Sequence, residues 1–167
     1  MSEPGRPEHD YRGRYVARRL DVGAILLRRW AGAWIDFIVL AGLFVASGFL
    51  MPRETLLVSL ALSLLVAIAY FVIGEGVWGR SLGKLLTGTV VVDAEGNPPG
   101  LARALIRTLL RLIEVNPFLL GGVPAGLIVW LTRAHQRLGD LLAGTYVVPR
   151  RGLMDVDRRR PSLATFD

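Results

Sequence analysis

The sequence predicts an all-α membrane protein: a helical bundle with two transmembrane helices, a further helical hairpin, and a small cytoplasmic two-stranded β element. Two apolar runs, residues 30–51 and 55–74, contain one charged residue between them, and each can cross a bilayer core of ~30 Å. Hydrophobic residues make up 52% of the 167 residues, and the mean hydropathy is +0.44, above that of ordinary soluble domains. An eleven-residue pattern also occurs twice and ends each time in a β-branched run.

The first predicted span follows an arginine pair and contains a single carboxylate. Trp30 marks the membrane interface, and Asp36 lies about 9 Å deeper at a rise of ~1.5 Å per residue. Arg29 precedes Asp36 by seven residues, so the two share a helix face and Asp36 leans back toward Arg29. An ionisable group at this depth is costly, and we interpret it first as a functional site. The alternative is a structural partner of Arg29.

The second predicted span, residues 55–77, follows a short external turn at residues 52–54. Ser59, Ser63 and Ala67 recur every four residues along it. Such stripes of small residues let membrane helices approach closely, and a shorter version occurs on the first span. The stripes therefore predict helix packing and self-association.

The repeated pattern covers residues 82–92 and 138–148, which are identical at eight of eleven positions. Each copy reads as a short helical turn, a Gly-Thr break and a strand. Neither strand is stable alone in water, so we expect the two strands to pair. Lys84 and Asp140 occupy equivalent positions in the two copies and could form an ion pair.

The segment between the copies begins with an amphipathic helix at residues 101–115. Three arginines at four-residue spacing lie on one face, which we interpret as a lipid-headgroup face, with ligand binding as the alternative. They are Arg103, Arg107 and Arg111. Residues 115–131 form either one short span or the far half of a hairpin bent at residues 121–124. Pairing of the strands requires an even number of crossings between them, which favours a partly inserted hairpin buried against protein.

The arginines outside the apolar runs predict the topology. Residues 1–24 and 150–167 read as disordered basic tails on either side of a membrane domain at residues 25–149. An excess of Lys and Arg marks the cytoplasmic side, so we expect a multi-pass protein of the plasma membrane with both termini in the cytoplasm. The same rule explains the net charge of +6, so we expect no nucleic acid as a partner. The expected partner is the lipid bilayer.

Several kinds of chemistry have no support in the sequence. There is no cysteine, which excludes disulfides, thiolate zinc sites and cysteine nucleophiles. His9 and His135 are expected to be solvated surface residues, and the glycine-rich segments have neither P-loop nor dinucleotide-binding spacing. We therefore expect no enzyme activity, no cofactor and no metal.

Three blocks of sequence, in a fixed order, point to a known family. Arg29 precedes Ile35-Asp36, residues 79–96 form the second block, and Asp140 opens the third. Together they resemble the RDD family of small membrane proteins, named for one arginine and two aspartates, over roughly residues 24–149. The family often has a histidine where this chain has Gly139, which departs from a His-Asp pair. The resemblance implies a membrane location and a transport role for unidentified ligands.

Two functions follow from these residues. In the first, the protein transports an ion, a proton or another ligand, with Asp36 as the binding carboxylate, Arg29 tuning it, and Asp140 approaching Arg29. In the second, it is a non-transporting membrane anchor or regulatory subunit, and these three residues form an internal structural network. Lys84, Glu75 and Glu114 are secondary candidates. The two glutamates are otherwise expected at the interface, capping a helix or pairing with nearby arginines. A bundle this small rarely encloses a pathway alone, so transport predicts a homo-oligomer or a partner membrane protein.

Overall fold

The structure is a computed structural model that describes residues 12–50, 52–114, 123–132 and 134–158, with the backbone alone at 112–114, 123–126 and 157–158. The described chain is mostly helical, with one short helical turn between the two longest helices and a pair of strands. In order along the chain, the elements are α1 (Arg12–Arg18), α2 (Val22–Leu50), η2 (Arg53–Thr55), α3 (Leu56–Trp78), α4 (Leu82–Thr87), β1 (Thr89–Val92), α5 (Leu101–Glu114), α6 (Val123–Leu131), α7 (Leu138–Leu142), β2 (Tyr146–Pro149) and α8 (Arg150–Arg158).

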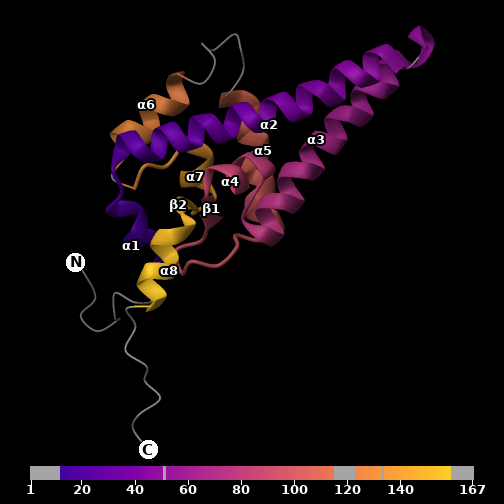
Figure 1. The fold of residues 1–167 in the computed structure, drawn as a ribbon. Coiled ribbons are helices and arrows are strands. Elements are labelled where there is room, and N and C mark those ends of the chain that lie inside the picture. The colour runs from indigo at the N-terminus through magenta and orange to yellow at the C-terminus, as the bar shows by residue number, and fades with distance from the viewer. Residues whose placement is uncertain (1–11, 51, 115–122, 133, 159–167) are drawn as a thin grey trace, which may run out of the picture.

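The helices α2 and α3 form a long apolar hairpin that projects from the rest of the molecule (Figure 1). Among the described residues, these are the two helices that are long and apolar enough to cross a membrane. Only 6% and 17% of their most apolar windows are buried inside the protein, and Phe49 and Leu57 are 87% and 81% exposed. A soluble monomer rarely leaves so large an apolar surface uncovered. The two predicted spans are therefore present as membrane-capable helices.

The small-residue stripe of α3 packs within the chain. Ser59, Ser63 and Ala67 are buried, and Ser63 Oγ donates a hydrogen bond to Ser47 Oγ of α2 at 3.2 Å. This face therefore serves the contact between α2 and α3. On α2, Gly42 is exposed with open space around it, so self-association through that surface stays a prediction.

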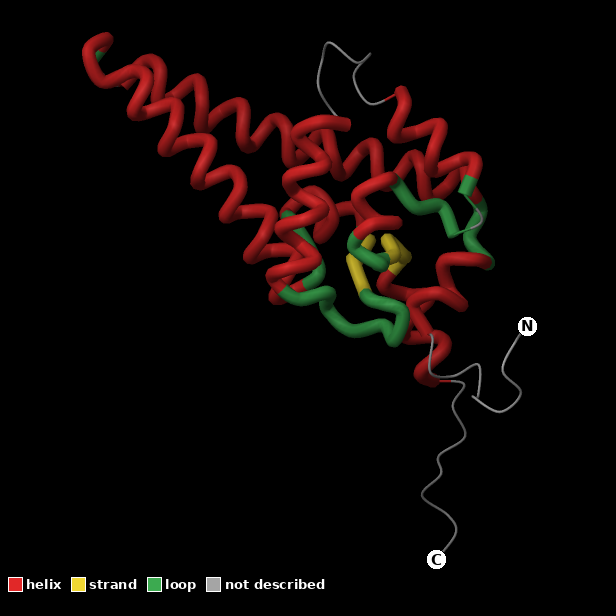
Figure 2. Tube along the Cα trace, turned by 180° about the vertical axis from the view of Figure 1, so that it is seen from behind, coloured by secondary structure: helices red, strands yellow, loops and turns green. Residues whose placement is uncertain are grey.

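The two copies of the repeated pattern form matching units. The pairing predicted from them is confirmed: β1 and β2 form an antiparallel sheet in which Val90 pairs with Val148 and Val91 with Val147. Gly88 and Gly144 precede the strands with φ angles of +69° and +62°, a left-handed conformation that glycine adopts without steric cost. Figure 2 shows the strands surrounded by the short helices and loops at the broad end of the molecule.

The similarity between the two halves extends beyond the repeated pattern. Each half contains a pair of helices, a short helix and a strand: α2, α3, α4 and β1 in the first, and α5, α6, α7 and β2 in the second. The packing corresponds as well, because α2 contacts α4 as α5 contacts α7, while α3 contacts α5 as α6 contacts α2. The chain is therefore built from two related halves that exchange contacts.

The second helix pair is shorter than the first. The nine residues of α6 extend about 14 Å at ~1.5 Å per residue, less than the ~30 Å of a bilayer core. Residues 115–122, where most of the predicted bend falls, lie outside the described residues. The choice between one span and a hairpin therefore stays a prediction.

Both predicted tails contain helices next to the sheet. Val16 and Ala17 of α1 are buried in one hydrophobic cluster with Val92, Tyr146 and Val148 of the strands, and residues of α8 pack against it. The sequence predicts disorder in these segments, but the structure has helices there, because apolar residues of α1 and α8 cover the sheet. The boundaries of the membrane domain stay a prediction.

Candidate functional site

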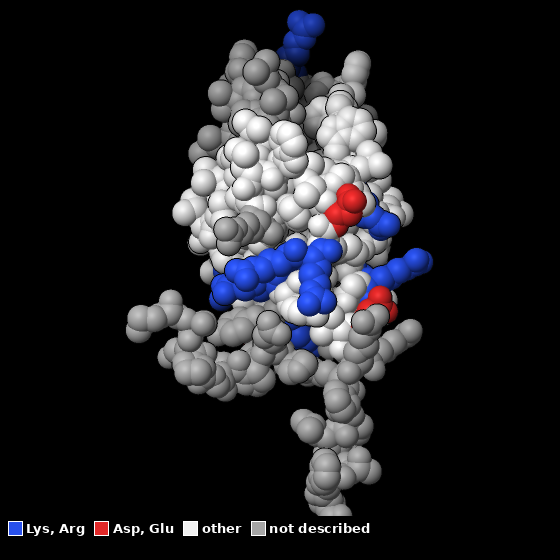
Figure 3. Space-filling model, turned by 90° about the vertical axis from the view of Figure 1, so that its left-hand side faces the viewer, with Lys and Arg blue, Asp and Glu red and all other residues white. Residues whose placement is uncertain are grey.

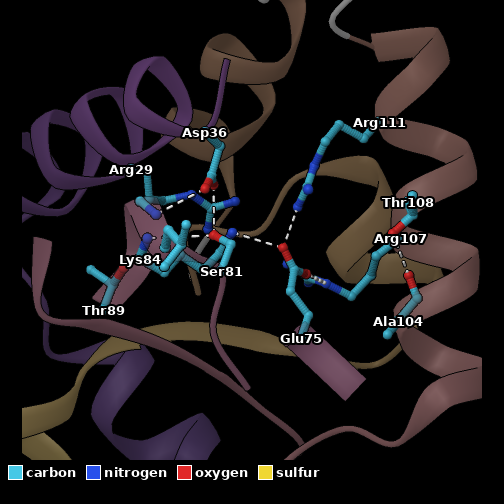
Figure 4. Close-up of polar contacts among 12 residues, drawn as sticks. Arg29, Asp36, Glu75, Ser81, Lys84, Thr89, Ala104, Arg107, Thr108 and Arg111 are labelled. Atoms are coloured by element: carbon cyan, nitrogen blue, oxygen red, sulfur yellow. Dashed lines mark hydrogen bonds and ion pairs between the residues drawn. The ribbon is translucent and has the colours of Figure 1, made fainter. Parts of the chain in front are cut away.

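Buried charged and polar side chains gather where α2, α3, α4, α5 and α7 meet, as Figure 4 shows in part. In the part of the chain that the structure describes, three carboxylates are buried: Asp36, Glu75 and Asp140. They belong to two groups. The Asp36 cluster consists of Asp36, Tyr70, Ser81 and Gly83, and the arginine network consists of Arg29, Glu75, Lys84, Arg107, Arg111 and Asp140.

Asp36 accepts hydrogen bonds from uncharged donors. Tyr70 Oη and the Gly83 backbone N–H donate to its Oδ1 at 2.7 and 2.8 Å, and Ser81 Oγ donates to its Oδ2 at 2.6 Å. Ser81 is also the N-cap of α4, where its hydroxyl accepts from the Lys84 N–H. These contacts hold the beginning of α4 against α2 and α3.

Two glycines allow α4 to reach Asp36. A Cβ atom on Gly83 would lie 1.9 Å from the Gly32 carbonyl oxygen and 2.9 Å from Asp36 Cγ, distances that real Cβ atoms do not reach. On the other helix, a Cβ on Gly32 would lie 3.1 Å from the Gly83 oxygen. The close approach of the two backbones therefore depends on glycine at position 83, and a Cβ at position 32 would be tightly packed.

Glu75 is fully buried among three cations. Its Oε1 accepts from Lys84 Nζ at 2.8 Å and from Arg111 Nη2 at 2.5 Å, and its Oε2 accepts from Arg107 Nε at 3.0 Å. Burial, only partly offset by Glu75, lowers the pKa of Lys84 to about 8. Glu75 thereby connects α3 to α4 and to two successive turns of α5.

Asp140 lies at the first turn of α7 between two arginines. Arg29 Nη2 donates to its Oδ2 at 2.6 Å, Arg107 Nη1 donates to its Oδ1, and the Arg137 backbone N–H adds a third contact at 3.0 Å. Burial by itself raises the pKa of Asp140, but the charges of Arg107 and Arg29 outweigh it and hold that pKa well below its ordinary value. Asp140 is therefore held as a carboxylate.

Of the three pairings predicted among the site residues, the approach of Asp140 to Arg29 is confirmed and the other two are not. Arg29 contacts Asp140 and the His135 carbonyl oxygen, whereas the expected contact with Asp36 does not occur among the described ion pairs. The proposed pair of Lys84 with Asp140 is wrong, since Lys84 binds Glu75. The reason is that Lys84 of α4 reaches Glu75 of α3, whereas Asp140 of α7 lies between Arg29 of α2 and Arg107 of α5.

Glu75 and two of the predicted headgroup arginines are interior residues. Glu75 has no exposed side-chain surface, which contradicts its expected place at the interface, whereas its expected pairing with nearby arginines is confirmed. Arg107 and Arg111 turn inward to it because α5 packs against α3, and only Arg103 stays 47% exposed, 3.7 Å from Asp93. The side chain of Glu114 lies outside the described residues.

Sequence reasoning missed several members of the site. Tyr70 belongs to no motif, and Ser81 lies in the second family block but was not named as a site residue, although both are polar residues in or just after a long apolar run. His135 was expected at the surface but is only 8% exposed, with φ +52° and its carbonyl oxygen bound by Arg29. Gln136 is buried too, and its Nε2 donates to the Thr145 carbonyl oxygen at 2.7 Å. His9 lies outside the described residues.

The site contains charged residues but no cluster of metal ligands. Within the described ranges, no group of three or more His, Cys, Asp or Glu side chains lies close enough to hold a metal ion. Each buried carboxylate is instead surrounded by hydrogen-bond donors from neighbouring elements. The expected absence of a metal or cofactor stays a prediction.

The fold and the site together define a small multi-helix protein with two apolar helices and a buried charge network. A family model for the RDD family matches residues 13–144, and the chain belongs to the RDD family. The comparisons with curated proteins and with solved structures gave no match. Family membership and the two apolar helices indicate a membrane protein.

Proposed function

We propose that the protein translocates a proton or a small cation across the plasma membrane, and that Asp36 is the carboxylate that takes it up. One observation carries the proposal. Of the buried carboxylates in the described part of the chain, Asp36 is the one without a cationic partner. An ion can therefore bind and leave there without breaking a buried ion pair.

The groups around Asp36 suit this role. Hydroxyls can donate or accept, so Ser81 and Tyr70 can reorient when the carboxylate gains or loses a proton. Glu75 and Asp140 are each bound by two or more cations, and displacing these would leave charges buried and unpaired. Asp36 also lies within α2, where an ionisable group is costly unless it serves a function.

The arrangement of the two halves provides a second argument. Substrate and ion sites of many transporters lie at the interface between internal repeats. Here Arg29 of the first half binds Asp140 of the second, and Glu75 of the first binds Arg107 of the second. The arginine network thus joins the halves next to the Asp36 cluster and would couple movement of one half to the other.

We place both chain termini in the cytoplasm. α1 and α8 contact each other beside the sheet, at the opposite end of the hairpin from η2 (Figure 1). Exposed arginines occur on α1, at the start of α2 and on α8, and Figure 3 shows a band of positive charge on that side of the molecule. Such an excess is typical of the cytoplasmic side. A bundle of this size would form a pathway as a homo-oligomer or with a partner membrane protein.

A non-transporting anchor or regulatory subunit is the alternative function. It is favoured by the connections that Asp36 makes, because its hydrogen bonds hold α2, α3 and the beginning of α4 together. In this case Asp36 serves packing alone, and its loss would lower stability rather than flux.

The variant Asp36→Asn separates the two functions. In proteoliposomes with a pH-sensitive dye and an imposed ion gradient, the wild type should move protons and Asp36→Asn should not, while both unfold at similar temperatures. Glu54→Gln is the matched control, since Glu54 is an exposed carboxylate in η2. Flux that persists in Asp36→Asn, or no flux in the wild type, would contradict translocation. A large loss of thermal stability would favour the structural role.

A further inference from the structure

We propose that Lys84 is a second proton-exchanging residue: its ammonium holds α4 against Glu75, and loss of its proton releases the first turn of α4 from Asp36. This role rests on the proposed function, because Lys84 would control the site at which the ion binds. Three observations carry the proposal: the charge balance of the arginine network, the presence of a lysine in that network, and the hydrogen bonds of the first turn of α4.

The arginine network carries an excess of positive charge. Two carboxylates, Glu75 and Asp140, meet four cationic side chains, which are Arg29, Lys84, Arg107 and Arg111. All six side chains are buried or nearly so, with exposed fractions between 0% and 17%. Buried charge without a counterion is strongly unfavourable, so the network gains when one cation loses its charge. Arginine keeps its proton in proteins, whereas a buried lysine gives its proton up readily.

Lys84 is the only lysine in the chain. Lys and Arg together number 20, and every other one of these residues is an arginine. Burial opposes the charge of Lys84, while Glu75, 2.8 Å from its Nζ, favours it. Burial is the larger effect and lowers the pKa of Lys84 to about 8. The Lys84 side chain is 14% exposed, whereas that of Glu75 has no exposed surface, so the proton of Lys84 is lost at the edge of the network.

The first turn of α4 connects Lys84 to the Asp36 cluster (Figure 4). The Lys84 backbone N–H donates to Ser81 Oγ at 3.4 Å, and Ser81 Oγ donates to Asp36 Oδ2 at 2.6 Å. The residue between them, Gly83, donates its N–H to Asp36 Oδ1 at 2.8 Å. Lys84 thus binds the arginine network with its side chain and the Asp36 cluster with its backbone. A movement of this turn removes two donors from Asp36 at once.

The other charged and titratable groups around α4 do not take this role. They are Arg28, Arg29 and Asp36 of α2, Tyr70 and Glu75 of α3, and Arg107 and Arg111 of α5. The arginines keep their charge over the range in which Lys84 titrates. Glu75 is bound by three cations, which favour its charged form, and the Tyr70 hydroxyl is bound between Asp36 and the Leu82 N–H. The strand β1 has no charged residue.

Loss of the proton changes how α4 is held. The ammonium of Lys84 becomes a neutral amine, the proton passes to water, and an ion pair becomes a weaker hydrogen bond. Glu75 keeps Arg107 and Arg111, so its charge stays compensated while α4 loses its tether to α3. The first turn of α4 can then move away from Asp36. The protonated state of Lys84 therefore closes the ion site, and the neutral state opens it.

A single lysine makes the titration directly observable. In the full-length protein labelled with 13C-lysine, the one Cε signal should shift with pH around a midpoint of about 8. A midpoint at the ordinary value of 10.5 would overturn the proposal.

Hydrogen exchange reports the release of α4. One pH unit above the midpoint, the amides of residues 81–87 should exchange roughly threefold to tenfold faster in the wild type than in Lys84→Arg, which cannot lose its charge. One unit below it, the two proteins should exchange equally. Equal exchange at both values would show that the charge of Lys84 does not hold α4.

Proton flux in proteoliposomes connects the titration to transport. At a constant pH difference across the membrane, wild-type flux should rise about tenfold from one pH unit below the Lys84 pKa to one above it, in step with the neutral amine. Lys84→Arg should keep the low flux at both values, and Lys84→Met should give the high flux at both. Arg103→Met is the matched control, since Arg103 is half exposed and 3.7 Å from Asp93, and its flux should rise as in the wild type. A full rise in Lys84→Arg would overturn control by Lys84.

The two proposals fail in different ways. Wild-type flux that stays constant while Lys84 titrates would uphold translocation and overturn the role of Lys84. No flux in the wild type would contradict translocation, and the titration and exchange experiments would still decide whether Lys84 holds α4. Asp36→Asn should abolish flux and keep the Lys84 transition. If Lys84→Met does not fold, Lys84→Arg and the labelled wild type decide the outcome.

Discussion

At the scale of single residues, similar aspartates acquire different properties from their neighbours. Asp36 is surrounded by two hydroxyls and a backbone N–H, whereas Asp140 lies between Arg29 and Arg107. The first can change its charge without disturbing an ion pair, and the second cannot. We therefore propose ion binding for Asp36 and a structural role for Asp140.

The first prediction concerns Asp140. Asp140→Asn should lower the free energy of unfolding by about 3–5 kcal/mol, because it leaves two buried arginines facing one charge fewer. Thermal unfolding in detergent with intrinsic tryptophan fluorescence measures the change. Asp93→Asn is the control: its partner Arg103 is half exposed and 3.7 Å away, so the loss should stay below about 1 kcal/mol. Equal losses for the two variants would refute the assignment.

The second prediction concerns the pH dependence that Lys84 imposes. Burial lowers the pKa of Lys84 from 10.5 to about 8 in the folded protein, so between these values the unfolded chain binds the proton and the folded one does not. Stability contributed by this group therefore rises as the pH increases from 8 toward 10.5. Unfolding curves measured across this range should show that the wild type gains stability relative to Lys84→Met as the pH rises. A constant difference would contradict the prediction.

At the scale of elements, α4 and α7 are equivalent in sequence but not in packing. Gly83 and Gly139 occupy the same position of the repeated pattern. A Cβ on Gly83 would overlap the backbone of α2, while a Cβ on Gly139 would lie 3.5 Å from the Leu110 Cβ, an ordinary contact distance. The backbone of α4 thus touches the backbone of α2, whereas α7 leaves room for a side chain against α5.

This difference yields the third prediction. Gly83→Ala should destabilise the protein by about 1–3 kcal/mol or more, because the two backbones must move apart. It should also weaken proton flux, since the Asp36 cluster includes the Gly83 N–H. Gly139→Ala, the matched variant in the other copy, should change stability by less than about 1 kcal/mol. Comparable unfolding temperatures for both variants would show that the close approach of α2 and α4 is not required.

At the scale of the whole molecule, the paired strands constrain the path of the chain. β1 and β2 belong to different halves and form one sheet, so the chain between them must return to the side from which it left. The turn η2 lies at the other end of the apolar hairpin (Figure 1). If α2 and α3 cross the membrane, the sheet and η2 are on opposite sides of it.

The fourth prediction tests this topology with single cysteines, which suit a chain that has none. A membrane-impermeant maleimide should label Glu54→Cys in intact cells, since this position is exposed in η2. It should label Asn97→Cys and Arg151→Cys, which are also exposed, only after the cells are permeabilised. External labelling at position 97 or 151 would show that the sheet is not cytoplasmic.

The sequence by itself determined the two long helices, the paired strands and the family of this protein. The two apolar runs predicted α2 and α3, and the repeated pattern predicted the pairing of β1 with β2, because hydrophobic length and β-branched runs are local properties. Three ordered blocks of sequence, at Arg29 to Asp36, at residues 79–96 and from Asp140, indicated the RDD family. These inferences need no knowledge of how the elements pack.

Only the tertiary structure decided which charges meet. The sequence predicted that Arg29 could meet both Asp36 and Asp140. In the structure Arg29 binds Asp140, and α4 brings uncharged donors to Asp36 instead. The spacing of the arginines of α5 likewise predicted a face toward lipid headgroups. In the structure, α3 places Glu75 against that face. An arginine or a carboxylate is satisfied by the nearest partner in space, and that partner depends on how closely two backbones can approach. In this chain, the contact between Gly32 and Gly83 sets how closely the backbones of α2 and α4 approach at Asp36.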